Sequence, residues 1–285
     1  MTSIATTPAL VRLRRSPLLP TSIVLLASLV VILPIGWIVS ASFKGRREAA
    51  ASPLSLPQSP MPENYVEAWN TARIADLITN SLIVSTVTVV VVLLLALPAA
   101  YAFAAFDFRG KRLLFVSLLV GLAIPISLLV VPLFYEILAF GLLDTHLALI
   151  LPQVAVGFPF AVLVLRGFIQ GLPRDILDAG RIDGCGDTRL LTAIIVPLTR
   201  PAIFAVLVLE FMWTWNQFLL PLILTQTASA RTLPLGMSIF LGRYGVNIPL
   251  LMAGAIISSI PIVLVYIVFQ RHMVKGITTG SVAGS

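Results

Sequence analysis

Residues 173–187 read Pro-Arg-Asp-Ile-Leu-Asp-Ala-Gly-Arg-Ile-Asp-Gly-Cys-Gly-Asp, and residues 196–201 read Val-Pro-Leu-Thr-Arg-Pro. This stretch is polar and carries charges of both signs, while the segments on either side of it are strongly apolar. A chain that keeps a polar stretch between two apolar spans exposes it to water at the membrane surface. The stretch therefore predicts a docking surface for a soluble partner.

The composition of the whole chain indicates a polytopic membrane protein. Of the 285 residues, 58% are hydrophobic and 11% are charged, and the mean hydropathy is +1.02. Soluble domains carry roughly 25% charged residues, so this chain has too little polar surface to face water on all sides. The formal net charge of +7 is explained by membrane topology, and no nucleic-acid partner is expected.

Six apolar segments are long enough to cross a bilayer, because about 20 helical residues span roughly 30 Å of hydrocarbon. They comprise residues 21–43, 78–105, 113–135, 147–165, 202–224 and 249–270. A cleaved signal peptide is the alternative for the first segment, but its length and the late Pro34 and Trp37 favour a retained span. We expect an all-α membrane protein with a six-span domain over 21–272, between tails at 1–20 and 273–285.

The distribution of Lys and Arg predicts the orientation of these spans. With the N-terminus inside, thirteen of the nineteen Lys and Arg residues fall in cytoplasmic segments and six in outer ones. The positive-inside rule then places both termini in the cytoplasm of a multi-pass cell-membrane protein. It also places residues 166–200 in the cytoplasm and the long loops 44–77 and 225–248 outside.

The sequence contains little that indicates catalysis. It has no Walker A pattern and therefore no ATP site of its own. The single Cys185 excludes an intrachain disulfide and a cysteine metal cluster, and His146 and His272 are too far apart to suggest a metal site. Asp178 and Asp183 are better interpreted as docking residues on a cytoplasmic helix than as an acid–base pair. We expect a conduit with no catalytic residue, no metal and no cofactor.

Residues 177–201 resemble the EAA loop of ABC-importer permeases. The positions that agree with that motif are Ala179, Asp183, Gly184, Pro197 and Pro201. Asp178, Gly180 and Cys185 stand where Glu, Ala and Ala are usual, and Gly costs a helix up to about 1 kcal/mol relative to Ala. The resemblance implies that this loop couples the chain to cytoplasmic ATPase subunits, through Asp178, Ala179, Gly180, Asp183, Gly184 and Pro197.

Four further motifs are similar to those of carbohydrate-importer permeases of the maltose-permease type, specifically the shorter six-span subunit. They are Asn80-Ser81, Gly-Leu-Leu-Asp-Thr at 141–145, Trp-Asn-Gln-Phe at 215–218, and the ending from Gln270 to Gly280. The resemblance covers nearly the whole chain and implies a type I ABC importer permease with a coupling helix between spans four and five. It further implies a second permease subunit, two ATPase subunits, an extracytoplasmic binding protein and a sugar substrate.

The fifth apolar segment is the predicted lining of the transport pathway. A carboxylate is expensive inside a membrane and usually faces the bundle interior or a water-filled cavity. Helical spacing places Glu210, Trp213 and Gln217 on one face, and Asn216 is next to Gln217. These four residues are candidate substrate contacts, because carboxylate and amide groups can hydrogen-bond sugar hydroxyls and an indole can stack on a sugar ring. Helix–helix contacts and an interfacial aromatic belt are the alternative interpretation.

The long outer loop 225–248 is expected to meet a partner. The resemblance implies contact with the binding protein, here through Arg231, Gly236, Arg243 and Tyr244. The glycines are expected to give the loop freedom to reach into a partner cleft; the alternative is that the loop is only a connector. Residues 144–146 flank a second, short outer loop and are expected to be solvated rather than to bind a ligand.

Two other functions stay open. A permease for a polyamine or an amino acid would share the same coupling loop. A secondary transporter would carry ionisable residues in several spans, whereas Glu210 is almost the only intramembrane charge here.

Prolines inside the spans either kink the helices around a cavity or serve packing alone; they are Pro98, Pro125, Pro132, Pro152, Pro159 and Pro261.

Overall fold

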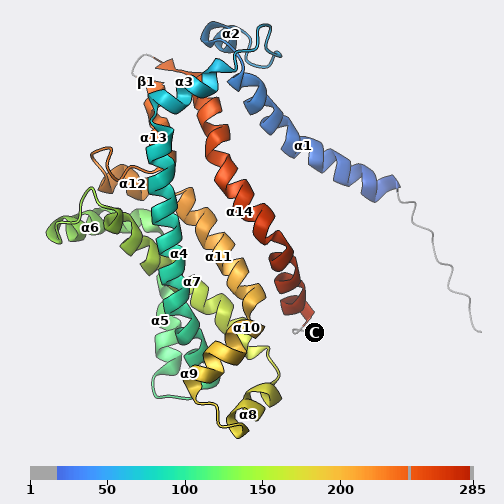
Figure 1. Ribbon diagram of the computed structural model, residues 1–285, viewed down its shortest axis with the longest axis vertical. Helices are drawn as coiled ribbons and strands as arrows, with labels where there is room; N and C mark the ends of the chain where they lie inside the picture. The colour runs from blue at the N-terminus through green and yellow to red at the C-terminus, as the bar shows by residue number, and fades with distance from the viewer. Residues whose placement is uncertain (1–17, 243–244, 283–285) are drawn as a thin grey trace, which may run out of the picture.

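The computed structural model describes residues 18–242 and 245–282. Its body is a bundle of four long helices, α4 (Ile74–Ala105), α7 (His146–Gln170), α11 (Arg200–Trp215) and α14 (Ile248–Val282). One end of the bundle carries α2 (Arg46–Ala51) and α3 (Glu63–Thr71), and the other carries α8 (Arg174–Ile182) and α9 (Asp187–Arg189) (Figure 1). These are called the α3 end and the α8 end below. The predicted N-terminal tail, apart from its last three residues, lies outside the described residues.

Within the described residues, four helices are long and apolar enough to cross a membrane. They are α1 (Leu18–Ser42), α4, α7 and α14. Two strongly bent helix pairs raise the number to six if each pair is one span. The helical membrane fold is as predicted, and α14 continues as a helix to Val282, beyond the predicted end of the last span at 270.

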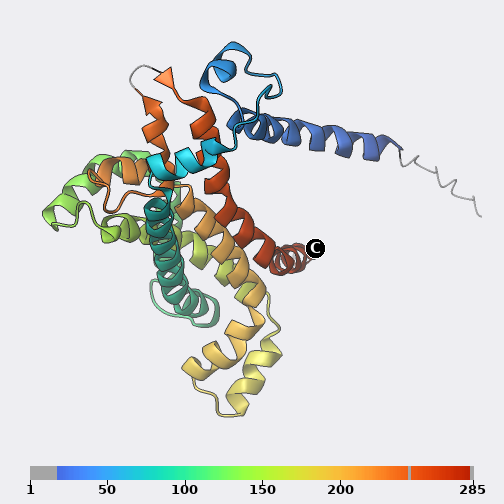
Figure 2. The ribbon, with the colours of Figure 1, turned by 45° about the horizontal axis from the view of Figure 1, so that its top comes forward.

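The first span stands apart from the bundle. Figures 1 and 2 show α1 extending away from the other helices, which it approaches only near α2 and α14. Its leucines, valines and isoleucines are mostly exposed. Such a surface is compatible with hydrocarbon and not with water, so this helix is surrounded by lipid or by other membrane helices.

The segment predicted as the third span, residues 113–135, is not a single straight helix. It is divided into α5 (Lys111–Ala123) and α6 (Ile126–Ala139), whose axes differ by 99°. Pro125 lies at the break with an extended ψ of 132°. Proline has no N–H for the helical ladder and disfavours the helical conformation of the residue before it, so α5 ends at this point.

The fifth predicted span, 202–224, is also divided. Helix α11 ends at Trp215, and a separate short helix, α12 (Leu219–Leu224), follows three residues later. Before α11, the chain runs through α9, a π-helical segment η1 (Leu190–Ile195) and α10 (Val196–Leu198), and then bends by 76° at Thr199. Pro197 and Pro201 flank that bend, and each removes a backbone donor that a continuous helix would need.

The packing of α4 against α7 forms the largest apolar cluster in the described chain. Small residues repeat every four positions on α4, at 92, 96 and 100, and face Ala161, Val162 and Leu165 of α7. This spacing keeps them on one helical face, and their small volume lets the two backbones approach closely. The cluster extends to η1, so the α8 end is anchored to the two most buried spans.

The predicted outer loops contain short ordered elements. Loop 44–77 holds α2 and α3, and loop 225–248 holds α13 (Leu233–Gly236), η2 (Met237–Phe240) and an antiparallel pair of two-residue strands, β1 (Leu241–Gly242) and β2 (Gly245–Val246).

Lys44 organises loop 44–77. Its side chain is fully buried, and Nζ donates to the carbonyl oxygens of Ser52 and Pro53 at 2.7 and 3.1 Å and to Ser55 Oγ at 3.2 Å. The amine is thus a structural brace with its three donors satisfied.

Asp144 joins the two loops that follow α6 and α12. Its carboxylate accepts hydrogen bonds from the backbone N–H groups of Gln226 at 2.6 Å and Thr227 at 2.8 Å, and its own N–H donates to Leu224. Asp144 is partly exposed, and it also links these loops, a structural role that the expectation of a solvated loop did not include. The N–H of Thr227, foremost among these donors, holds the pKa of Asp144 below its ordinary value, and the charge of Arg231 adds to the effect.

A pair of substitutions at residue 144 tests this link. Asp144 has a positive φ of 60°, which both Asn and Gly tolerate. Asp144→Asn keeps an acceptor oxygen, whereas Asp144→Gly removes it, so we expect the glycine variant to have the lower melting temperature at pH 7.

The pH dependence of the melting temperatures of the wild type and Asp144→Gly provides the control. Because the folded-state pKa is depressed, the carboxylate stabilises the fold above its ordinary pKa near 4, and this contribution is lost as pH falls through the lowered value. The difference in melting temperature between the wild type and Asp144→Gly should therefore shrink below about pH 4. A difference that stays constant to pH 2.5 would contradict the proposed link.

Candidate functional site

The helix α8 is a self-contained unit at the α8 end. It begins directly after Pro173, whose fixed φ and extended ψ of 127° redirect the chain from α7. It ends in two hydrogen bonds that close the last turn, from Gly184 N–H to Arg181 O and from Cys185 N–H to Gly180 O, both at 3.0 Å. Gly184 supplies the positive φ of 78° that this Schellman motif requires.

Gly180 lies where α8 packs against η1. A Cβ at this position would lie 2.8 Å from Cδ1 of Ile194 and 3.2 Å from Cδ1 of Leu190. The buried face of α8 thus approaches η1 closely because residue 180 has no side chain. This gives a physical reason for glycine at a position where the related motif usually has alanine.

Much of the rest of α8 is exposed, and Asp178 also borders a hollow beside α4 and α7. Asp178, Ala179, Asp183 and Gly184 are exposed. Ile182, which the sequence analysis did not single out, has 86% of its surface exposed at the end of this helix. The single ion pair there, between Asp178 and Arg181 at 3.4 Å, is exposed on both sides and contributes little to stability.

Pro197, the last residue of the predicted coupling set, is half-buried in α10 just before the bend at Thr199. The hydroxyl of Thr199 donates to Ile195 O at 2.8 Å, and its N–H donates to the same oxygen at 2.8 Å. At the other side of this unit, the hydroxyl of Tyr101 on α4 donates to Asp187 Oδ1 at 3.2 Å. The unit that carries α8 is therefore attached to α4 and to the start of α11.

A second site lies halfway along the bundle. All four predicted pathway residues line one cavity of about 270 Å³, together with residues of α6 and α7. The argument from a common helical face is wrong for Gln217, because α11 ends at Trp215; the residue reaches the cavity through the turn that follows. In that turn Gln217 Oε1 accepts from Leu219 N–H at 3.2 Å.

Glu210 is the ionisable group of this cavity. It is 2% exposed, and within the described residues its Oε1 atom accepts no hydrogen bond. Gly157 of α7 lies directly opposite; a Cβ there would be 2.5 Å from Oε2 and 2.9 Å from Cδ of Glu210. The absence of a side chain at residue 157 therefore creates the space that the carboxylate occupies.

The remaining polar groups of the cavity come from two helices. Trp213 is 53% exposed, and its ring packs on Phe160 with centroids 4.8 Å apart. Gln153 of α7 donates a hydrogen bond from Nε2 to Leu149 O at 2.8 Å. Its Oε1 is buried and accepts no hydrogen bond in the described structure. Sequence reasoning missed Gln153, although an amide within an otherwise apolar span was an available signal.

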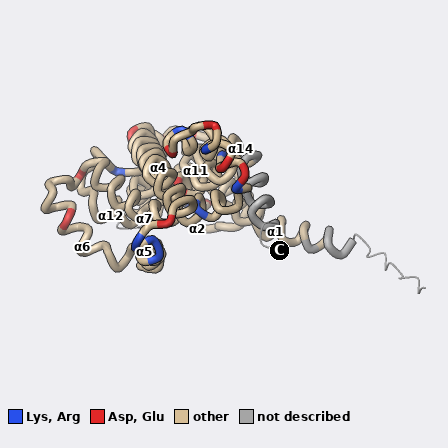
Figure 3. Tube along the Cα trace, turned by 90° about the horizontal axis from the view of Figure 1, so that it is seen from below, with Lys and Arg blue, Asp and Glu red and all other residues tan. Residues whose placement is uncertain are grey.

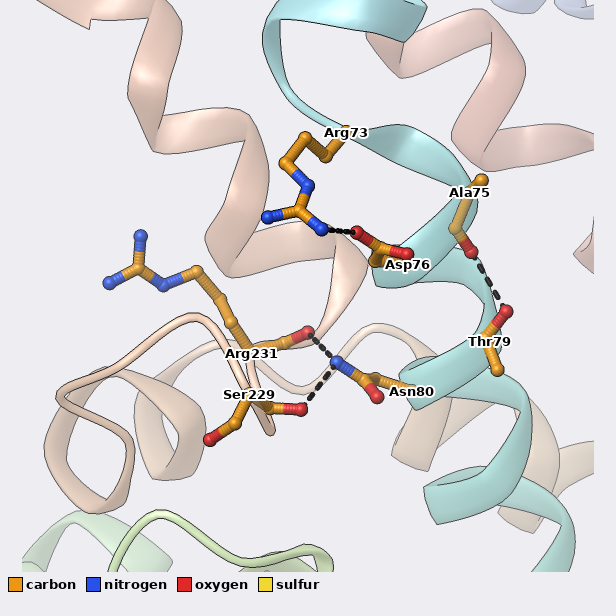
Figure 4. Close-up of polar contacts among 7 residues, drawn as sticks. All are labelled: Arg73, Ala75, Asp76, Thr79, Asn80, Ser229 and Arg231. Atoms are coloured by element: carbon orange, nitrogen blue, oxygen red, sulfur yellow. Dashed lines mark hydrogen bonds and ion pairs between the residues drawn. The ribbon is translucent and has the colours of Figure 1, made fainter.

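The outer loop contains a third candidate region. Asn80 of α4 donates through Nδ2 to the carbonyl oxygens of Ser229 at 3.1 Å and Arg231 at 3.0 Å (Figure 4). The side chain of Arg231 points away from Asn80 and lines a pocket of about 470 Å³, as does Arg73, which forms an ion pair with Asp76 at 2.7 Å. The Asn80-Ser81 motif thus has a structural role, because it attaches loop 225–236 to α4.

Other predicted residues of this loop have different positions. Gly236 has a helical φ of −60° and is buried; a Cβ there would collide with the side chain of Leu77. Its glycine is explained by close packing on α4 and not by freedom to reach a partner. Arg243 and Tyr244 lie outside the described residues. No group of three potential metal ligands from His, Cys, Asp and Glu occurs within residues 18–242 and 245–282.

The comparison with protein families matches residues 93–279 to a family described as "Binding-protein-dependent transport system inner membrane component". The chain belongs to this family. It is a membrane permease subunit of an importer, and its matched region includes α7 to α11, the part that holds α8 and the cavity at Glu210.

Curated relatives of the permease extend over most of its length. It is 37% identical to the diacetylchitobiose uptake system permease protein NgcG of Streptomyces coelicolor, over 94% of this chain and 89% of the relative. It is 32% identical to the arabinooligosaccharides transport system permease protein AraQ of Bacillus subtilis, over 91% and 93%. It is 34% identical to the trehalose/maltose transport system permease protein MalG of Thermococcus litoralis, over 91% and 94%.

Solved structures share the permease fold. A chain of a bacterial ABC transporter involved in the import of the acidic polysaccharide alginate superposes with a TM-score of 0.77 at 20% identity, covering 93% of this chain and 99% of the other. A second alginate transporter structure, in complex with a pentasaccharide-bound periplasmic protein, gives a TM-score of 0.67 at 17% identity, over 92% and 93%. At this level of identity the likeness establishes the fold alone.

The contact between Gly157 and Glu210 makes a testable prediction for the permease. Gly157→Ala forces the carboxylate to move within a packed site, and overpacking of this kind costs about 1–3 kcal/mol. We expect a lower melting temperature in detergent for Gly157→Ala. The effect should be much smaller when the same change is made in a Glu210→Ala background, where the obstructing atoms are absent. Equal losses in both backgrounds would show that the two residues are not in contact.

Proposed function

We propose that this permease is one of two membrane subunits of an ATP-driven sugar importer, in which partner ATPase subunits hydrolyse ATP and drive transport through α8. The observation that carries this proposal is the arrangement of α8. One of its faces is packed against η1 at Gly180, and the other presents a largely exposed isoleucine, Ile182, to solvent. A short helix with an exposed apolar residue, fixed to the spans but projecting beyond them (Figures 1 and 2), fits a groove in a soluble protein.

The proposed ATPase contact involves the exposed part of the coupling set. Asp178 and Asp183 provide the polar rim around Ile182, and Ala179 and Gly184 are small exposed residues beside it that allow close approach of a partner. Gly180 and Pro197 have a supporting role, since the first allows α8 to pack on η1 and the second contributes to the bend before α11. The link from η1 to α11 then connects movement of α8 with the cavity that contains Glu210.

The proposed orientation follows from charge. The α8 end has more Lys and Arg residues than the loops 44–77 and 225–248, which together contain six. The eight at the α8 end are Arg109, Lys111, Arg112, Arg166, Arg174, Arg181, Arg189 and Arg200. This excess of basic residues favours the cytoplasmic side. Both termini, including the tails 1–20 and 273–285, are then cytoplasmic, and the loops 44–77 and 225–248 face the outside.

An extracytoplasmic binding protein is the proposed partner of the α3 end. Asp144 accepts a hydrogen bond from Gln226 N–H, and Asn80 donates one to Ser229 O, so the first part of loop 225–248 is attached to the bundle and presents a defined surface. The pocket beside it contains Arg231 and the exposed Ile239, which are suitable for contact with a protein surface. We include Arg243 and Tyr244 of the same loop in this proposed contact and assign Gly236 a packing role within it.

A sugar is the proposed substrate because the relatives named above are permeases for diacetylchitobiose, arabinooligosaccharides and trehalose or maltose. The cavity at Glu210 has suitable chemistry for it. The unsatisfied oxygens of Glu210 and Gln153 can accept hydrogen bonds from sugar hydroxyls, and the exposed indole of Trp213 offers a stacking surface. Asn216 and Gln217 complete the polar lining, and a second permease subunit would close the open side of the cavity.

Substitution of Gly184 tests the coupling proposal. Gly184→Val places a β-branched residue at φ 78°, which costs roughly 1–2 kcal/mol or more and distorts the end of α8. We expect uptake of labelled diacetylchitobiose, maltose or trehalose by cells that express the whole importer to fall at least fivefold. Membrane insertion should be unchanged.

The matched control is Gly184→Asn, because Asn tolerates positive φ and should retain most of the uptake. Copurification of the ATPase should fall with Gly184→Val and persist with Gly184→Asn. If Gly184→Val transports as the wild type does, α8 is not the coupling element. If the wild-type complex holds an ATPase but imports none of the sugars, the coupling proposal stands and the substrate proposal is wrong.

A further inference from the structure

A separate hollow lies at the α8 end, away from the cavity at Glu210. It has a volume of about 760 Å³ and lies where α4 ends, α5 begins and α7 approaches its end. Its lining combines aromatic and basic side chains: Phe103, Phe108, Lys111, Arg112, Phe115 and Arg166. Because three spans end here, the hollow lies at the level where hydrocarbon gives way to lipid headgroups.

The hollow has an excess of positive charge. Lys111 is neutralised by Asp107 at 3.1 Å, and its Nζ also donates to Phe106 O at 2.6 Å. Neither Arg112 nor Arg166 forms an ion pair with any residue of the described chain. Figure 3 shows the basic residues gathered at the start of α5, where Arg109 adds a further charge beside the hollow.

Arg166 is held in a fixed orientation. Its guanidinium carbon lies 4.0 Å from the centroid of the Phe115 ring, and Nε donates to Phe103 O at 3.4 Å. The stacking and this hydrogen bond leave the terminal nitrogens free to bind an anion. A planar guanidinium that is oriented in this way is well suited to hold a phosphate by two hydrogen bonds.

The hollow is continuous with an apolar surface. Phe103 packs edge-on against Phe115, with centroids 5.6 Å apart, and both residues line the hollow. Along α5, none of whose residues is buried, Leu113 and Val116 point outward and are exposed. A ligand held at Arg112 and Arg166 would therefore have an anionic group at the helix ends and an apolar chain along α5.

We propose that this hollow binds an anionic phospholipid. Arg112 and Arg166 hold the phosphate of the headgroup, and one acyl chain lies on Leu113 and Val116. The unneutralised charge favours an anionic headgroup over a zwitterionic one, and the adjoining apolar surface favours a lipid over a soluble anion. The inference is independent of the transported substrate and of the contact made by α8.

The test uses the intact importer complex in mixed micelles with either phosphatidylglycerol or phosphatidylethanolamine. A photoactivatable phosphatidylglycerol analogue should label the segment 103–116 in preference to a matched phosphatidylethanolamine analogue. In the double variant Arg112→Gln and Arg166→Gln this labelling should fall about tenfold, because each basic residue near an anionic lipid contributes appreciably to binding.

The charge-matched control is the double variant Arg46→Gln and Arg47→Gln, which removes two exposed arginines at the α3 end and should leave the labelling unchanged. Native mass spectrometry of each complex checks that all subunits are present. Four results would overturn the proposal: equal labelling by both lipids, equal labelling in the Arg112/Arg166 double variant, displacement of the label by inorganic phosphate, or cross-linking of segment 103–116 to another protein subunit.

Discussion

Hydrocarbon offers no hydrogen-bond partner to a broken helix, and the positions of the breaks in this permease follow from that constraint. Each break occurs at a residue that cannot make the next backbone hydrogen bond of the helix, or at a residue whose backbone and side chain supply hydrogen bonds to the free groups at the break. Pro125 separates α5 from α6. At the bend before α11, both the hydroxyl and the N–H of Thr199 donate to Ile195 O. These breaks produce the projecting helix at one end and the cavity at Glu210, so the functional regions depend on them.

The two ends of the bundle are stabilised in different ways. At the α3 end, polar side chains satisfy backbone groups of the loops: Lys44 donates to two carbonyl oxygens, Asp144 accepts from two N–H groups, and Asn80 donates to two carbonyl oxygens. The α8 end is held mainly by apolar packing of η1 on α4 and α7. Local hydrogen bonds keep a surface in one shape, whereas packing between helices allows a rigid unit to shift as a whole. This difference suits a fixed docking platform at one end and a moving coupling element at the other.

Much of the fold could be predicted from the sequence, because hydropathy and charge depend on residue type alone. The spans at α1, α4, α7 and α14 were predicted in this way, whereas the short helix between the fourth and fifth spans was implied by the resemblance to ABC-importer permeases. The breaks inside the third and fifth segments were not predicted, since many prolines, including Pro98 and Pro261, lie within continuous helices here. The contact of Gly157 with Glu210 and the burial of Lys44 depend on residues distant in the sequence, which no local pattern reveals. Ile182 was overlooked because an apolar residue on a helix is normally assigned to a core.

The central claim is that the exposed face of α8 contacts an ATPase subunit. The most direct test is cysteine cross-linking in native membranes, with Ile182→Cys in a Cys185→Ser background and Ile239→Cys at the α3 end as the control. Both positions are well exposed. A bifunctional thiol reagent should link residue 182, and not residue 239, to a polypeptide that carries a Walker A motif. Absence of that product at residue 182, or its formation at residue 239, would contradict the account.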